Sequence, residues 1–472
     1  LTPDDIADLK DVSDAQIHPG GQLVAFVVGN QFVTETKLPR SNIWTVPTGG
    51  GEPRQLTHGR LADTTPRWSP DGETLAFLSD RAEGGQRQIY LLPAKGGEAG
   101  RLTNIEGAIP TSRGLNPMRW SPDGRQIAFM KVEADTEDEK RRKAEGYDER
   151  AFEQAPKFTR LYLGDVGTGE VSCVSPDGLQ VWEFCWAPSG QEVAVVASDL
   201  PFERSWYGCR LAKFSLGDGP AQTLHDTRRQ VSTPVWSPDG RSIVFLSSTW
   251  SDRGSVGGGI FVVPTEGGEA RELSADHVTS ASWLEWTDDS RRLVTAAHER
   301  GSVGLAEVEV ASGKRHSLWK AEAALAETSW QQFSRDAQGN IAVVLEDDSN
   351  PRDVWVADRS AGEPAWTQLT RLHPRSSELS LGPVETVHWK GADGWEVQGL
   401  LVRPPMASVS DRPPLVTIVH GGPTSVHAHR YLGALGGAWS AWPQLLAANG
   451  LAVFLPNPRG STGWGLEFAQ AN

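Results

Sequence analysis

The chain has few cysteines and no long hydrophobic run. Three of its 472 residues are cysteine: Cys173, Cys185 and Cys209. They show no Cys-x-x-Cys spacing, and the sequence has no Asn-x-Ser/Thr glycosylation site. These absences favour free thiols in a reducing compartment. The first residues, "LTPDDIADLK", are acidic and polar rather than signal-like, and no stretch reaches the length of a membrane span. We therefore expect a cytoplasmic protein without a membrane partner.

Basic side chains are also in deficit. The sequence has 45 Lys and Arg against 60 Asp and Glu, which gives a formal net charge of -15. A nucleic-acid-binding protein needs a basic face to displace counterions from phosphates, so nucleic acid is excluded as a partner. From Pro374 onward the charges balance, with six acidic and six basic side chains. The charge distribution therefore divides the chain into two different parts.

Glycine and proline are abundant, at 50 and 31 residues, and they mark an internal repeat. The motif "WSPDG" occurs at 68–72, 120–124 and 236–240, each time followed by an apolar tetrad. Degenerate copies begin at Ile17, Trp186, Trp286 and Phe333, and successive copies are 47 to 66 residues apart. Ser-Pro-Asp-Gly matches the residue preferences of a type I turn, so each copy predicts a hairpin.

Each repeat contains two further strand-like segments, such as "IWTVP" and "RQLT" in the first copy. Four short strands about every fifty residues are typical of a propeller blade. We predict an all-β seven-bladed propeller over residues 1–372. A β-sandwich or an array of hairpins is the alternative, but sandwiches do not repeat one turn sequence at a fixed period. Because every unit runs in the same order, we expect the first strand not to complete the last blade.

The longest repeat contains an insertion at 133–157, in which nine acidic and six basic side chains make up most of the segment. Mixed charge runs usually face water, so a solvated excursion from the third blade is one interpretation. The other is a flap over the face where a second domain lies. In that case Arg150 would bind the acidic group of a peptide substrate.

A different pattern begins after residue 372. "VETVHWKGADGWEVQGLLVRP" predicts a hairpin, "LVTIV" and "LAVFL" predict buried strands, and "WPQLLAANG" predicts a helix that ends at Gly450. This order is that of the first part of an α/β sheet, over residues 373–472. With "HGGPTS" at 420–425 and "NPRGSTGWG" at 457–465, the whole chain resembles the prolyl oligopeptidase family of serine peptidases, and within it the acylaminoacyl-peptidase branch.

The resemblance implies a propeller that covers an α/β-hydrolase domain and limits substrates to short peptides. It also implies that the N–H of Gly422 donates to the oxyanion formed during acyl transfer, while His420, Gly421 and Pro423 shape the loop. Alternatively, the glycine pair only makes a tight turn after a strand. For Arg459, a structural role is favoured over contact with substrate.

Histidines 420, 427 and 429 also suggest a metal site. No Cys, Asp or Glu lies close to them in sequence to complete a tetrahedral ligand set, so we expect no metal and no cofactor.

The sequence has no Gly-x-Ser-x-Gly segment, in which an α/β-hydrolase carries its nucleophile. The second domain is therefore expected to be incomplete, without nucleophile, acid or base, and the chain alone to be inactive. We expect the amino-terminal portion of a serine exopeptidase whose partners are short peptides and the missing carboxyl-terminal part. Exposed strand edges in the partial sheet also suggest a homo-oligomer. The alternative function is a non-enzymatic propeller scaffold that binds peptides or proteins.

Overall fold

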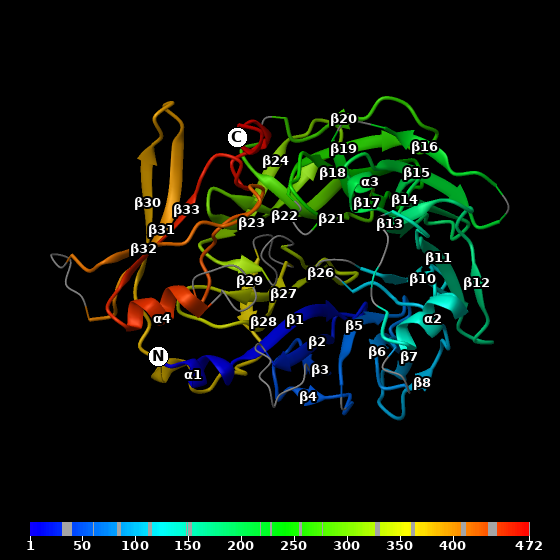
Figure 1. Cartoon of the computed structure of the whole chain (residues 1–472), viewed down its shortest axis with the longest axis horizontal. Helices are drawn as coiled ribbons and strands as arrows, with labels where there is room; N and C mark the ends of the chain where they lie inside the picture. Colours follow the sequence, from blue (N-terminus) through cyan, green and yellow to red (C-terminus); the bar gives the residue numbers. More distant parts are fainter. Residues whose placement is uncertain are drawn as a thin grey trace.

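The computed structural model describes residues 1–471 except for 31–39, 60, 83–85, 112–115, 148, 150–152, 218, 227–228, 254–256, 276, 326–330, 360–363, 407–411 and 433–440. Within these ranges the chain forms eight β-sheets, seven of them antiparallel and the last mixed. Figure 1 shows the antiparallel sheets following one another around a ring, with the mixed sheet and α4 beside it.

The first four antiparallel sheets each contain four strands. They are β1 (Lys10–Ile17), β2 (Leu23–Asn30), β3 (Ser41–Pro47) and β4 (Arg54–Gln55); β5 (Asp63–Trp68), β6 (Thr74–Ser79), β7 (Gln88–Pro93) and β8 (Gly100–Arg101); β9 (Met118–Trp120), β10 (Gln126–Val132), β11 (Thr159–Asp165) and β12 (Val171–Cys173); and β13 (Gln180–Trp186), β14 (Glu192–Ser198), β15 (Arg210–Ser215) and β16 (Gln222–His225).

The next three antiparallel sheets continue the pattern, and the seventh has a fifth short strand. They are β17 (Gln230–Trp236), β18 (Ser242–Ser248), β19 (Gly259–Pro264) and β20 (Arg271–Glu272); β21 (Ser280–Trp286), β22 (Arg292–Glu299), β23 (Ser302–Glu309) and β24 (Arg315–Ala321); and β25 (Ala324–Leu325), β26 (Ser334–Arg335), β27 (Ile341–Glu346), β28 (Asp353–Asp358) and β29 (Ala365–Gln368).

The repeated motif makes the hairpin turns that the sequence predicts. In the copy at Ser69, the Gly72 N–H donates to the Ser69 carbonyl at 2.8 Å, and the Ser69 hydroxyl donates to the Asp71 carboxylate at 2.5 Å. Gly72 has a φ of +73°, which favours glycine at this position. The copies at Ser121 and Ser237 repeat the backbone hydrogen bond at 2.9 Å. The motif therefore encodes its own turn.

The tryptophan that opens the motif links neighbouring sheets. The indole N–H of Trp68 donates to the carbonyl of Gln16 in the preceding sheet at 3.1 Å. Trp120 makes the equivalent bond to Arg67 at 2.9 Å. A buried indole N–H needs such a partner, so each bond fixes one sheet against the next.

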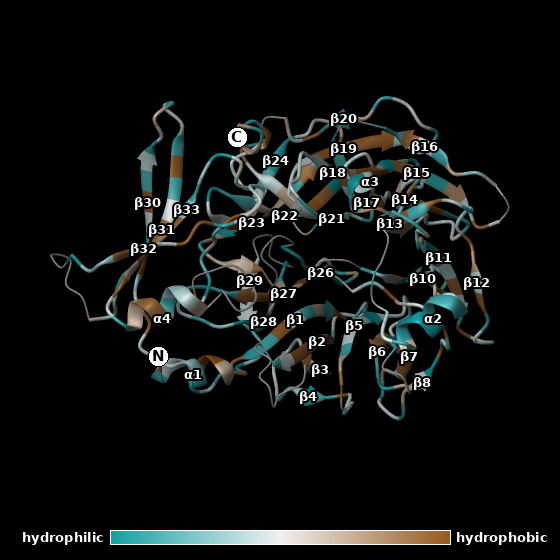
Figure 2. Ribbon diagram, in the orientation of Figure 1, coloured by the Kyte–Doolittle hydropathy of each residue, from teal (hydrophilic) through white to brown (hydrophobic). Residues whose placement is uncertain are grey.

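Buried side chains close the ring. Separate apolar clusters join each antiparallel sheet to its successor, and one cluster joins the seventh sheet to the first through residues such as Val12, Phe26 and Val344. Strand β1 pairs with β2, and the described part of the chain shows no pairing of β1 with the seventh sheet. Side-chain packing rather than a shared strand therefore closes the ring, as the sequence predicts. In Figure 2 the strands of the ring carry most of the hydrophobic colour.

The mixed sheet has the order β30 (Val384–Lys390), β31 (Glu396–Val402), β33 (Ala452–Asn457) and β32 (Leu415–Thr417). Helix α4 (Trp442–Ala448) packs Ala447 against Leu400 and Val453 on one face of this sheet. Gly450 follows α4 with a φ of +83°, as expected of a helix-ending glycine.

Two expectations about these strands need correction. The expected exposed strand edges do not include "LAVFL", because β33 pairs with β31 on one side and β32 on the other. "LVTIV" is not a buried strand, because β32 spans three residues at the sheet edge and leaves Leu415 59% exposed. An edge position has one hydrogen-bonding neighbour, which explains the exposure.

The remaining helical segments are short. Helix α1 (Pro3–Ala7) packs Ile6 against Tyr431 and Leu432, so the amino-terminal end contacts the second part of the chain. The others are α2 (Glu137–Ala144), α3 (Glu203–Trp206), η1 (Ser376–Glu378) and α5 (Leu466–Ala469). None of the helices in the described ranges has the length and apolar character needed to cross a bilayer. The three cysteines are free, Cys173 exposed and the other two buried.

Candidate active site

The glycine loop begins where β32 ends. The Ile418 N–H still donates to the Phe454 carbonyl on β33, at 2.9 Å, before the chain leaves the sheet at His420. Gly421 and Gly422 are both exposed. The Gly422 N–H makes no hydrogen bond to any residue that the structure describes. The loop therefore presents a backbone donor to its surroundings.

Gly422 cannot be replaced without strain, whereas Gly421 can. Gly422 has a φ of +124°, and a Cβ atom built there would lie 2.6 Å from the backbone nitrogen of Thr424. At Gly421 a Cβ would meet nothing within 4 Å. Only the second member of the glycine pair is therefore required by the backbone conformation, a requirement that an oxyanion loop and a tight turn share.

His420 connects the glycine loop to the second conspicuous motif. Its Nδ1–H donates to the Gly421 carbonyl at 2.9 Å, and its Nε2 lies 3.1 Å from the Ser461 hydroxyl oxygen. The Pro458 carbonyl lies 2.6 Å from the same oxygen, so Nε2 and this carbonyl share the one hydroxyl proton of Ser461. Burial lowers the pKa of His420, so the ring is neutral at pH 7. The two motifs are therefore parts of one hydrogen-bonded unit.

The Ser461–His420 contact resembles a nucleophile and its base, but the geometry does not support that role. Ser461 is fully buried, so a substrate carbonyl cannot reach its hydroxyl. The other ring nitrogen of His420 faces a carbonyl, whereas the base of a catalytic triad is oriented by a carboxylate. This serine therefore has a structural role.

Asn457 fixes the segment that follows the loop. Its carboxamide oxygen accepts from the His427 N–H at 2.7 Å, and its amide donates to the His427 carbonyl at 3.0 Å and to Gln398 at 2.7 Å. Asn457 is fully buried. The pair of bonds to one backbone residue acts like a short strand pairing, which holds the loop against the end of β33.

The three histidines of the possible metal site use their ring atoms in different ways. His420 faces Gly421 and Ser461, whereas the Nε2–H of His427 donates to the Ile418 carbonyl at 3.2 Å. His429 contacts Asp348 through Nδ1 at 2.6 Å. No group of three potential metal ligands occurs among the described residues. Burial, followed by the neighbouring His420 ring, lowers the pKa of His427 to about 3.

The ring of sheets holds the same segment from two sides. The Ser251 N–H donates to the Thr424 hydroxyl at 2.8 Å, and the two hydroxyl oxygens lie 2.7 Å apart. On the other side Arg430 pairs with the buried Glu346 at the end of β27. The residues that flank Gly422 are therefore positioned by elements more than 70 positions earlier in the chain.

Comparisons with known proteins identify relatives of the chain. The TolB β-propeller domain profile matches residues 12–155. The whole chain is 28% identical to the uncharacterized peptidase YuxL of Bacillus subtilis, of which it covers 72%. Over 99% of its length it is 25% identical to dipeptidyl-peptidase 5 of Porphyromonas gingivalis, of which it covers 69%. Over its whole length the chain is thus similar to peptidases, in agreement with the resemblance to the prolyl oligopeptidase family.

Solved structures share the family fold. An acylaminoacyl peptidase of Pyrococcus horikoshii superposes with a TM-score of 0.72 over 98% of this chain and 68% of its own, at 19% identity. A puromycin-hydrolyzing peptidase of Mycobacterium tuberculosis gives 0.68 over 99% of this chain and 69% of its own, at 17% identity. At these identities the superpositions show the fold alone.

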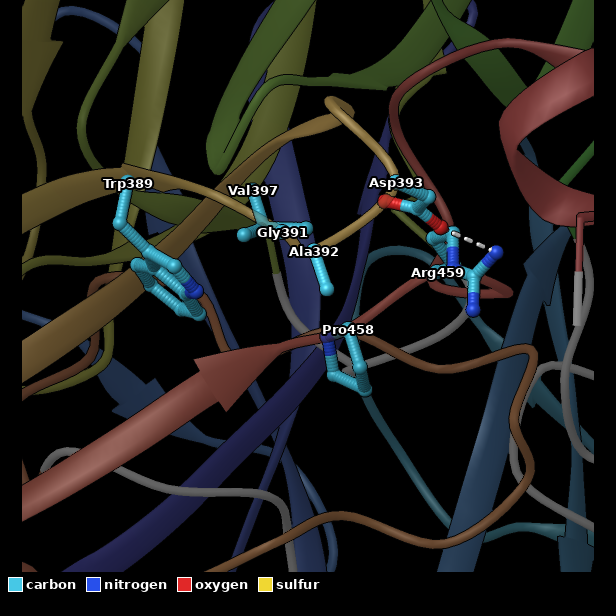
Figure 3. A pocket seen from close by; sticks show the side chains of 7 residues that line it. All are labelled: Trp389, Gly391, Ala392, Asp393, Val397, Pro458 and Arg459. Carbon is cyan, nitrogen blue, oxygen red and sulfur yellow. Dashed lines mark ion pairs between the residues drawn. The ribbon is translucent and has the colours of Figure 1, made fainter.

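Arg459 contacts another part of the chain. Its guanidinium pairs with Asp393 on the β30–β31 turn at 2.5 Å, and both side chains are partly exposed. Trp389, Val397 and Pro458 join this ion pair around a hollow of about 480 Å³ (Figure 3). The pair ties the turn of the hairpin to the loop after β33.

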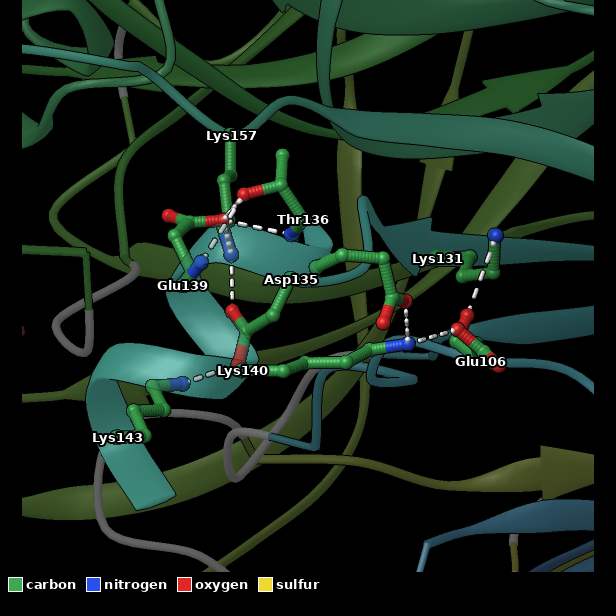
Figure 4. A network of polar contacts seen from close by, with 9 residues as sticks. Glu106, Lys131, Asp135, Thr136, Glu139, Lys140, Lys143 and Lys157 are labelled. Carbon is green, nitrogen blue, oxygen red and sulfur yellow. Dashed lines mark hydrogen bonds and ion pairs between the residues drawn. The ribbon is translucent and has the colours of Figure 1, made fainter. Parts of the chain in front are cut away.

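Arg150 lies outside the described residues, so its predicted contact with substrate stays a prediction. The structure describes most of the insertion that contains Arg150, and α2 within it has no buried residue. Lys157 contacts Asp135 and Glu139, and Lys140 contacts Glu106 (Figure 4). In the visible part of the insertion, the charges therefore largely neutralise one another at the surface.

Proposed function

We propose that this chain is the amino-terminal portion of a serine exopeptidase, similar to the acylaminoacyl-peptidases, that hydrolyses short peptides by acyl transfer. The observation that carries the proposal is the Gly422 loop, an exposed backbone donor held between the ring and the mixed sheet. The comparisons support it, because the relatives that match the whole chain are peptidases.

We also propose the division of the chain. Residues 1–372 form a seven-bladed propeller, one blade for each antiparallel sheet, and residues 373–472 form the first part of an α/β-hydrolase domain. The order of the mixed sheet and the parallel pairing of β32 with β33 support the second assignment. In this arrangement the ring acts as a size filter that admits short, flexible peptides and excludes folded proteins.

In the proposed reaction, a serine outside these 472 residues attacks the peptide carbonyl while a histidine accepts its proton. The carbonyl oxygen becomes an anion, and the Gly422 N–H donates to it. The C–N bond then breaks, the histidine returns the proton to the leaving amine, and water hydrolyses the acyl-serine ester. Because nucleophile and base are absent from the chain, we expect it to be inactive alone.

The test is a pair of glycine variants in the protein that contains the complete hydrolase fold. Gly422→Ala displaces the donor, so kcat for a short peptide should fall by about 10²- to 10³-fold, the usual effect of losing one oxyanion donor. Gly421→Ala is the matched control and should retain activity, because its Cβ meets no neighbour. Equal activity of the two variants would contradict the assignment. A complete protein that binds peptides without cleaving them would favour the scaffold alternative.

A further inference from the structure

We propose that Arg253 is a specificity-determining residue that binds the carboxylate of a short peptide beside the Gly422 loop. Arg253 follows β18 in the fifth antiparallel sheet, two residues after Ser251. The proposal extends the proposed function, on which it rests for the choice of ligand. The evidence for the Arg253 site itself is structural.

The segment that carries Arg253 is firmly placed. Trp250 is buried, its backbone N–H donates to the Gln230 side chain at 2.8 Å, and its indole donates to the Gly257 carbonyl at 3.0 Å. The Tyr207 hydroxyl donates to the Ser251 carbonyl at 2.7 Å. These bonds hold the backbone at Trp250 and Ser251, just before Arg253.

The same segment touches the candidate active site. Ser251 makes two hydrogen-bond contacts with Thr424, and a Cβ atom at Gly422 would lie 3.4 Å from the Ser251 hydroxyl. Arg253 therefore lies on the part of the ring that contacts the Gly422 loop. A charge in this position can act on a substrate held by that loop.

The guanidinium of Arg253 is held in place but keeps its donors available. Its Cζ lies 4.2 Å from the centroid of the Trp182 ring, and the residue is exposed. Within the described ranges it forms no ion pair or hydrogen bond. The negative charges of Glu183 and Glu203 interact with the Arg253 guanidinium through space. The Glu183 carboxylate already accepts hydrogen bonds from the Ser232 hydroxyl and the Thr233 N–H. The contact with the Trp182 ring holds the planar guanidinium group and leaves its N–H donors available to a ligand.

A carboxylate is the ligand that this arrangement fits. Guanidinium groups bind carboxylates with two parallel N–H···O bonds, and a charge-assisted pair is about twice as strong as a neutral hydrogen bond. In a short peptide the carboxylate is either the terminal carboxyl or an acidic side chain. Both have the same chemistry, so the experiment must separate them.

The experiment measures peptide affinity of the 472-residue chain by titration calorimetry. The ligands are N-acetylated tetra-alanine with a free carboxyl terminus, the same peptide as its amide, and an amide whose last residue is glutamate. The wild-type chain should bind the free carboxylate about tenfold more tightly than the plain amide, the usual effect of a hydrogen bond to a charged group. Tight binding of the glutamate peptide identifies any nearby carboxylate as the ligand, and weak binding identifies the terminal one.

Three variants complete the design. R253Q should lose the preference and bind both alanine peptides with the affinity of the amide, whereas R253K should retain part of it. R241Q is the matched control, because Arg241 is an exposed arginine at the opposite end of β18. The proposal is overturned if the wild-type chain binds none of the peptides, or if it binds the free-carboxylate peptide and the plain amide with equal affinity. It is also overturned if R253Q retains the preference for the carboxylate. A carboxylate preference that depends on Arg253, found together with equal kcat of the Gly422 and Gly421 variants, would contradict the proposed function and still support the Arg253 site.

Discussion

The Arg430 guanidinium lies 2.5 Å from the Glu346 carboxylate, and both side chains are more than 90% buried. The same Glu346 oxygen accepts from Arg352 at 3.0 Å, and Arg352 reaches Asp11 on β1 at 2.8 Å. Burial alone would raise the pKa of Glu346, but Arg352 and Arg430 outweigh it and hold that pKa below its usual value. One line of charges thus joins the first sheet, the seventh sheet and the segment after the glycine loop.

Breaking this line should destabilise the protein strongly. Removing one partner of a buried ion pair leaves an uncompensated charge, at a cost of about 3–5 kcal/mol in the free energy of unfolding. We expect Arg430→Met to show a loss of this size in urea-induced unfolding. The exposed pair Lys95–Glu73, at 3.7 Å, is the control, and Lys95→Met should change stability by less than about 1 kcal/mol. Equal effects of the two variants would contradict the role of the buried pair.

The contact between His429 and Asp348 predicts a pH-dependent stability. Burial alone would lower the pKa of His429, but the hydrogen bond and charge of Asp348, helped by Glu322, raise it above the ordinary value. A raised histidine pKa stabilises the folded state below the unfolded pKa, and this contribution is lost as pH rises through the folded pKa.

Asp348→Asn should therefore lower the melting temperature clearly at pH 6 and much less at pH 9. Differential scanning calorimetry at the two pH values measures the difference. Asp288→Asn, at an exposed turn position, is the control and should have a small effect at both. A destabilisation by Asp348→Asn that does not change with pH would show that His429 is not charged in the fold.

Glu285 on β21 also predicts a stability that falls as pH rises, but here the cause is a buried carboxyl group. Burial raises its pKa to about 7, although Arg335 and Arg119 oppose the shift. The folded state then binds a proton that the unfolded state releases above about pH 4.5, so stability should fall as pH rises from about 5 to 8. Glu285→Gln cannot ionise, and should melt at a higher temperature than wild type at pH 8 but similarly at pH 5.

The exposed Glu266 is the matched control for this variant, and Glu266→Gln should leave the pH dependence of melting unchanged. If Glu285→Gln instead lowers the melting temperature at pH 8, the ionised carboxylate contributes favourable pairing with the arginines. The burial argument would then be wrong for this residue.

Limited proteolysis should leave a resistant fragment that ends near residue 373. Apolar clusters join neighbouring sheets around the ring, whereas β32 at the edge of the mixed sheet is largely exposed. Mass spectrometry of early fragments tests this expectation, and first cleavage inside the ring would contradict it. Addition of the rest of the hydrolase fold should protect the region after residue 373.

Local features of the fold were predictable from the sequence because each depends on residues close together in the chain. A type I turn needs four consecutive residues, and the Ser69–Gly72 hydrogen bond lies within them. The apolar tetrads and the helix-ending Gly450 are local for the same reason. The glycine loop was found through its short motif, although the strand before it is shorter and more exposed than "LVTIV" suggests.

Contacts between distant residues were decided by the tertiary structure. Thr424 meets Ser251 across 173 positions, and Arg430 meets Glu346 across 84. No periodicity relates these residues, because ring closure and the placement of the mixed sheet beside it determine which loop ends meet. Arg253 shows the same limit. Nothing in the sequence distinguishes Arg253 from the other arginines. Two tertiary contacts do: its guanidinium lies over the Trp182 ring, and its neighbour Ser251 contacts the glycine loop.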